Sequence, residues 1–138
     1  MSMFNIFDTA ASGMSVQSLR LNLISSNLAN VDSVSSSIEQ TYRARHPVFA
    51  AVLDEMNPDN PAMGVQMKGV VESQAPLVSE YAPDHPLANE EGYIYRPNVN
   101  VVEEMANMIS ASRAYQSNVE VVNTAKTLMT ATLQLGSN

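Results

Sequence analysis

The residues best suited to chemistry are scarce in this chain of 138 residues. His46 and His85 are its only histidines, each stands directly before a proline, and cysteine is absent. A structural zinc site takes four ligands, and two isolated histidines without a suitably spaced carboxylate do not supply them. The sequence therefore predicts no metal site, no disulfide and no thiol nucleophile, and it places both histidines in loops.

Two pairs of adjacent carboxylates are the remaining candidates for catalysis. Neighbouring helical residues point about 100° apart, so Glu103 and Glu104 do not converge on one substrate atom. Both stand in the first turn of a predicted helix, where a carboxylate interacts favourably with the helix dipole. Glu90 and Glu91 are explained by a solvated turn. We therefore predict no catalytic residue and no cofactor, with a hydrolase that uses two carboxylates as the enzymatic alternative.

Two asparagines are spaced so that they share one face of a helix. Asn27 and Asn30 stand three residues apart. Asparagine at a helix end can bond free backbone carbonyls or cap a neighbouring segment. Two exposed polar residues would give the same pattern, so the pair alone is a weak signal of function.

Net charge and hydropathy narrow the classes of partner. The net charge of −7 disfavours nucleic acid and anionic membrane surfaces, since both attract basic proteins. No stretch approaches the roughly 18 apolar residues of a membrane span. The start MSMFNIFDTA lacks the basic and apolar regions of a secretory signal. We expect a soluble chain that, if it leaves the cytoplasm, does so without a cleaved signal peptide.

The first helix is predicted from about Phe4 to Val31. Its apolar residues recur every seven positions in two rows, as at the a and d positions of a coiled coil. The rows are Phe7, Met14, Leu21, Leu28 and Ala10, Gln17, Ile24, Val31. Gln17 is a polar interruption, and Gly13 lowers the helix propensity. The Ser-rich run 32–37 ends the helix.

The last helix is predicted over 101–135. Asn100 is a suitable N-cap, Glu103 follows at the spacing of a capping box, and Gly136 is a natural stop. Apolar residues again recur every seven positions, and further apolar residues flank that row on both sides. The row is Val101, Met108, Tyr115, Val122 and Met129, with Met105, Val119 and Leu133 on one flank and Val121, Leu128 and Leu135 on the other.

This helix is longer than a compact chain could enclose. At 1.5 Å per residue it would extend roughly 50 Å, whereas a compact domain of this size is roughly 35–40 Å across. Both terminal segments also carry few charges, and their polar positions are Ser, Asn, Thr and Gln. A charge-poor outer face suits close packing against other helices, so we expect an elongated molecule whose helix ends need partners.

The middle of the chain has a different character. All seven prolines lie in 47–97. The segment 64–73 alternates as a strand does, with 77–81 as its predicted partner; 42–53 is extended or mixed, and 54–63 is a loop. We therefore predict a mainly α fold in which long N- and C-terminal helices form a coiled-coil-like pair around a small β-rich insert. The predicted parts are 1–36 (N-terminal helix), 37–99 (insert) and 100–138 (C-terminal helix).

Two segments resemble a known family. SSNLANVDS, residues 25–33, resembles the signature that closes the first helix in the bacterial flagellar rod and hook family. HPLANEEGYIYRPNVNVVEEMANMISASRAYQSNVEVVNTAKTLMTATLQLG, residues 85–136, resembles the C-terminal half of proximal rod proteins in that family. The chain departs from the family in 33–63, where a Gly-rich PYR turn is usual and SVSSSIEQTYRARHPVF begins this segment instead.

The resemblance implies a structural role. Members are exported through the flagellar type III apparatus without a cleaved signal, and they assemble in the periplasm into a tubular drive shaft that transmits torque. Expected partners are copies of this chain, other rod proteins and the export apparatus. The alternatives are another rod or hook protein and a soluble export chaperone or adaptor.

The predicted assembly interface combines the helical rows with the two asparagines. Its residues are Phe7, Met14, Leu21, Ile24, Asn27, Leu28, Asn30, Val31, Val101, Met105, Met108, Tyr115, Val119, Val122, Met129 and Leu133.

Overall fold

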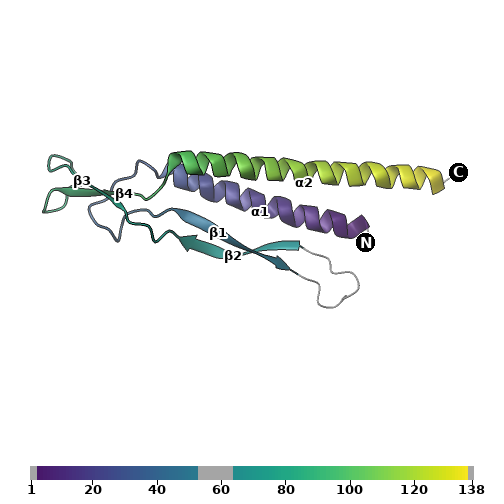
Figure 1. Cartoon of the computed structure of the whole chain (residues 1–138), viewed down its shortest axis with the longest axis horizontal. Helices are drawn as coiled ribbons and strands as arrows, with labels where there is room; N and C mark the ends of the chain where they lie inside the picture. The colour runs from purple at the N-terminus through teal and green to yellow at the C-terminus, as the bar shows by residue number, and fades with distance from the viewer. Residues whose placement is uncertain (1–2, 53–63, 137–138) are drawn as a thin grey trace.

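The computed structural model describes residues 3–52 and 64–136, so the loop predicted over 54–63 lies outside the described residues. Two long helices lie side by side, with both termini at one end of the molecule and the smaller sheet at the other (Figure 1). In chain order the elements are α1 (Met3–Ala29), β1 (Arg45–Val52), β2 (Gly64–Glu72), β3 (Val78–Tyr81), β4 (Tyr93–Arg96) and α2 (Val101–Gly136).

The prediction of a mainly α fold is wrong. Two helices flank a β insert, but the insert contains four strands in two separate antiparallel sheets, which makes the fold α+β. The strand predicted at 77–81 is present as β3, but β4 was missed for a physical reason. β4 has four residues, which is too short for a period of two to stand out in the sequence.

The predicted partner of β2 is also wrong. β2 pairs with β1, with Arg45 opposite Glu72 and Val52 opposite Gly64, while β3 pairs with β4. The connection after β2 turns the chain away from a hairpin with β3. Asn98 Nδ2 donates to the carbonyl of Ala75 at 2.8 Å, and this bond draws the connection toward the segment before α2.

The ends of both helices follow from their caps. α1 ends at Ala29, because Asn30 Nδ2 donates to the Ser26 carbonyl at 2.8 Å and satisfies an acceptor of the last turn. Val31 therefore lies beyond the helix that was predicted to include it. At α2, Asn100 Oδ1 accepts from the backbone N–H of Val102 at 3.1 Å and of Glu103 at 3.4 Å, which confirms the predicted N-cap.

Little of the chain is buried. Seven apolar side chains of the described residues form the core: Ala10, Val16, Ile24, Ala44, Ile94, Ala111 and Ala125. The accessible surface is 9445 Å², whereas a compact monomer of this mass has about 7000 Å². Much surface that a compact domain would bury is therefore exposed.

Candidate assembly interface

Asn27 is the centre of a polar cluster that joins three parts of the chain. Its side chain is fully buried at the end of α1. The amide nitrogen donates to the Arg45 carbonyl at 3.0 Å and to Glu104 Oε2 at 3.1 Å. The amide oxygen accepts from the Arg45 N–H at 2.9 Å and from the Tyr42 hydroxyl at 2.8 Å. Both donor hydrogens and both acceptor positions of the amide are thus paired, so its burial leaves no polar atom without a hydrogen bond.

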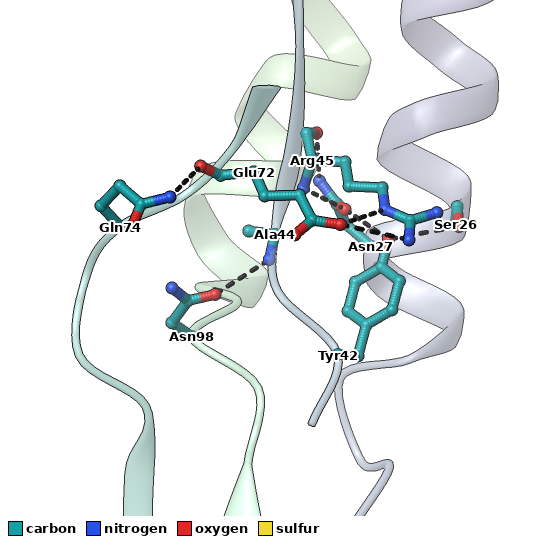
Figure 2. Close-up of polar contacts among 8 residues, drawn as sticks. All are labelled: Ser26, Asn27, Tyr42, Ala44, Arg45, Glu72, Gln74 and Asn98. Atoms are coloured by element: carbon teal, nitrogen blue, oxygen red, sulfur yellow. Dashed lines mark hydrogen bonds and ion pairs between the residues drawn. The ribbon is translucent and has the colours of Figure 1, made fainter. Parts of the chain in front are cut away.

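The residues around Asn27 hold the start of β1 against the end of α1 (Figure 2). The Tyr42 hydroxyl also lies 3.2 Å from the Ser26 hydroxyl. The Arg45 guanidinium lies 5.3 Å from the centre of the Tyr42 ring and 3.3 Å from Glu72 Oε1. Tyr42 is therefore fixed by hydrogen bonds at its hydroxyl and by a cation on its ring.

Asn98, in the segment that precedes α2, likewise joins separate parts of the chain through hydrogen bonds of its side chain. Its oxygen accepts from the Ala44 N–H at 2.9 Å, and its nitrogen donates to the carbonyl of Ala75. The Arg43 guanidinium donates to the carbonyls of Ser73 and Ala75 at 3.1 and 3.2 Å. Bonds from side chains thus satisfy an irregular backbone that has no ladder of its own.

Two further contacts fix how the helices face each other. Arg20 donates to Asn107 Oδ1 at 3.0 Å, and Asn27 reaches Glu104 closer to the start of α2. Asn118 lies beside Gly13, where a Cβ built on the glycine would be only 2.8 Å from the Asn118 Nδ2. Residues later in α1 therefore contact residues earlier in α2, so the two helices are antiparallel.

The helices meet through small and polar residues. Glu104, Ala111 and Ala125 are buried on α2, and Asn118, half-buried, completes a row at intervals of seven residues. The predicted apolar row is off-centre, because Val101 and Tyr115 are 40% and 38% exposed. Small side chains let two helix backbones approach closely, whereas larger ones are displaced to the flanks.

The structure divides the predicted interface residues into three groups. Ile24 and Asn27 are buried within the chain. Val101, Met105, Tyr115 and Leu133 are exposed. The half-buried remainder is Phe7, Met14, Leu21, Leu28, Asn30, Val31, Met108, Val119, Val122 and Met129.

Other large apolar residues of α2 are exposed although the prediction left them out of the interface. They are Val102 at 77%, Ile109 at 55%, Val121 at 44%, Leu128 at 57% and Leu135 at 81% exposed. Among the described elements α2 packs against α1 alone, so these side chains face solvent in the single chain. The heptad spacing of Val121, Leu128 and Leu135 was a signal in the sequence for these three residues.

The groups first considered for chemistry do not gather. Glu103 is exposed and Glu104 is buried against Asn27, while His85 Nδ1 accepts from the Leu87 N–H at 3.1 Å within a turn. In residues 3–52 and 64–136, no three potential metal ligands lie together. Neither helix in this part of the chain combines the length and apolar character that crossing a membrane requires.

Two known protein families match the segments of the chain that contain the two helices. The family described as "Flagella basal body rod protein" matches residues 7–35, and the family "Flagellar basal body rod FlgEFG protein C-terminal" matches residues 90–135. The first match contains α1 from Phe7 onward with the Asn27 cluster's asparagine, and the second contains β4 and nearly all of α2.

Whole-chain relatives carry one name. The chain is 49% identical over 136 residues to the flagellar basal-body rod protein FlgC of Salmonella typhimurium and 50% identical over 136 residues to that of Escherichia coli O6:H1, in each case over 99% of both chains. It is 33% identical over 149 residues to FlgC of Borreliella burgdorferi, over 98% of both chains. The chain therefore belongs to the FlgC family of flagellar basal-body rod proteins.

Proposed function

We propose that this chain is a structural subunit of the proximal flagellar rod, which it builds through its two terminal helices. The observation that carries the proposal is the exposed apolar surface of α2, above all Val102, Leu133 and Leu135 at 77%, 68% and 81% exposed. Burying one such side chain contributes roughly 1.5–3 kcal/mol, so a surface shared among subunits stabilises an assembly strongly.

The arrangement of the two sequence ends supports this role. α2 has 36 residues and α1 has 27, and the free end of α2 extends past the start of α1 (Figure 1). A partner that continued the α1 track would cover this end. The proposed partners are copies of this chain and other rod proteins, reached after export by the flagellar type III apparatus without a cleaved signal, in the periplasm.

The Asn27 cluster has a separate part in the proposal. It fixes the end of α1, the start of β1 and the start of α2 in one rigid unit, through bonds to Arg45 and Glu104. Torque applied to one helix is then passed to the other without the pair sliding. This role needs only hydrogen bonds and packing, so we propose assembly rather than catalysis.

The test compares two aspartates close together on the same helix end. Leu133→Asp places a charge in the exposed apolar surface, and Thr127→Asp places the same charge at an exposed polar position on another face of the helix. Both isolated chains are expected to keep their stability within about 0.5 kcal/mol, since both sites are exposed. Leu133→Asp should abolish swimming in soft agar and remove the chain from purified basal bodies, and Thr127→Asp should do neither. Equal swimming of the two strains would overturn the proposed interface.

A further inference from the structure

The sheet of β3 and β4 lies at the end of the molecule opposite both termini, and its β3 edge is free (Figure 1). On the other edge, Tyr95 of β4 exchanges backbone hydrogen bonds with Ser35 at 2.9 and 3.0 Å. Tyr95 stands opposite Ser79, so the backbone N–H and C=O of Ser79 point away from β4, as do those of Tyr81 two residues later. Among the described residues these four groups have no hydrogen-bond partner.

Two exposed tyrosines lie at this edge on one face of the sheet. Tyr81 and Tyr93 stand opposite each other, with ring centres 5.2 Å apart in an edge-to-face arrangement. Their exposed fractions are 64% and 39%. Gly92 makes room for the Tyr81 ring, because its φ is +82° and a Cβ built on it would lie 2.9 Å from Tyr81 Cε2. The backbone thus holds an aromatic pair in place although much of the pair faces solvent.

The turn that joins β3 to β4 is acidic. Asp84, Glu90 and Glu91 are exposed, and none of them forms an ion pair within the part of the chain that the structure describes. Arg96 is the only Lys or Arg in 78–96, and its Nε already lies 3.0 Å from Glu80 Oε2. Three unpaired carboxylates therefore stand close in sequence to the two exposed tyrosine rings.

We infer that the β3 edge binds an extended segment of another protein, and that this segment carries Lys or Arg side chains. Free backbone groups at a sheet edge pair with an added strand. The unpaired carboxylates attract cations, and an exposed tyrosine ring binds a cation over its face. Charge and aromatic surface thus select the same class of partner. This surface is separate from the terminal helices, so the inference goes beyond the proposed function.

A second copy of this chain suits the β3 edge less well than a different protein does. The net charge of −7 means that a second copy offers an excess of carboxylates and not of cations. Four of its seven basic side chains are also bound within the chain already: Arg20, Arg43, Arg45 and Arg96. Charge complementarity therefore favours a partner of different sequence.

A photo-crosslinking residue at the β3 edge tests the inference. Cells that lack the native protein would produce the tagged full-length chain with p-benzoylphenylalanine in place of Ser79, which is exposed and leaves both tyrosines intact. Swimming cells would be irradiated, and the crosslinked products purified under denaturing conditions and identified by mass spectrometry. The expected product joins this chain to a different protein, through a peptide that has Lys or Arg beside the crosslinked residue.

Matched variants in the same crosslinking chain separate charge and ring from folding. Glu90→Lys combined with Glu91→Lys should lower the crosslink yield at least tenfold, whereas Asp32→Lys combined with Glu39→Lys, at exposed carboxylates elsewhere, should leave it unchanged. Tyr81→Leu should lower the yield at least threefold, and Tyr81→Phe, which keeps the ring, should retain it. Unfolding of the purified variants in urea confirms that they are folded.

Four results would overturn the inference. They are crosslinks only to copies of this chain, crosslinks to peptides without Lys or Arg beside the crosslinked residue, no crosslink at all, and a yield that survives charge reversal at Glu90 and Glu91. If the cells swim and the chain is present in basal bodies, each of these results leaves the proposed function intact. Absence of the unmodified chain from basal bodies would overturn the proposed function, which the crosslink does not test.

Discussion

At the scale of single residues, the buried amide of Asn27 holds the end of α1 against the start of β1 and the start of α2. Asn27 and Ile94 are the largest fully buried side chains of the described residues. A buried amide is tolerable only where all its polar atoms are paired, and Asn27 meets this condition through Tyr42, Arg45 and Glu104. The spacing of Asn27 and Asn30 placed both on one helix face. The hydrogen-bond partners of Asn27 are remote in the chain, so the burial of Asn27 could not be predicted.

Removing the Asn27 side chain should destabilise the fold. Asn27→Ala leaves buried groups of Arg45 and Glu104 without partners, and we expect the free energy of unfolding in urea to fall by about 2–4 kcal/mol. Asn22→Ala, at an exposed position of the same helix, has the same effect on helix propensity and should change it by less than about 0.5 kcal/mol. Equal losses in the two variants would show that the Asn27 bonds add little.

Gly13 should be required by its neighbour rather than by its own backbone. Alanine would normally stabilise a helix by about 1 kcal/mol relative to glycine. Here its Cβ would come within 2.8 Å of Asn118 Nδ2, so the gain should be lost. In an Asn118→Ala background the same substitution should become more favourable by about 1 kcal/mol or more, as measured by a double-mutant cycle of urea unfolding. Additive effects would place Gly13 away from the close contact.

At the scale of elements, the sequence predicted the helices better than the sheets. Long periodic segments with identifiable caps gave α1 and α2 to within two residues, since Asn100 and Asn30 act locally. Strand pairing depends on contacts made elsewhere. The partner of β2 is set by Asn98 and Arg43, which bind the chain after β2, and no local pattern around 64–73 reveals them.

The small residues between the helices explain why the predicted apolar row of α2 does not lie at the centre of the contact with α1. A search for apolar heptads finds 101, 108 and 115, whereas the closest contact runs through Ala111 and Asn118. Ala111 is completely buried. The same heptad spacing was visible in the sequence, but close packing selects small side chains that an apolar criterion overlooks.

The half-buried residues beside this contact should matter to the single chain as well as to the assembly. Met108→Asp or Val119→Asp puts an unpaired charge at the helix pair, so each should lower the free energy of unfolding by about 2–4 kcal/mol and abolish swimming. Gln116→Asp adds the same charge at an exposed position and should do neither. Unfolding in urea followed by circular dichroism gives the stability, and normal swimming of Met108→Asp would contradict the helix contact.

At the scale of the whole molecule, the single chain is an incomplete structure. Its surface is 9445 Å², about a third more than a compact monomer of this mass exposes. The excess includes the apolar face of α2, which no other described element covers. The predicted length of the last helix and the few charges of the terminal segments already indicated an elongated molecule with uncovered helix ends. Which side chains remain uncovered follows only from the packing of α2 against α1.

Labelling of one engineered cysteine tests the burial of this face most directly. Leu133→Cys would be reacted with a maleimide in the isolated chain and in basal bodies purified from swimming cells, where it is the chain's only thiol. The side chain is 68% exposed in the single chain. We predict rapid labelling of the isolated chain and labelling at least ten times slower in basal bodies. Equal rates in the two samples would contradict the claim that neighbouring subunits cover the exposed face of α2.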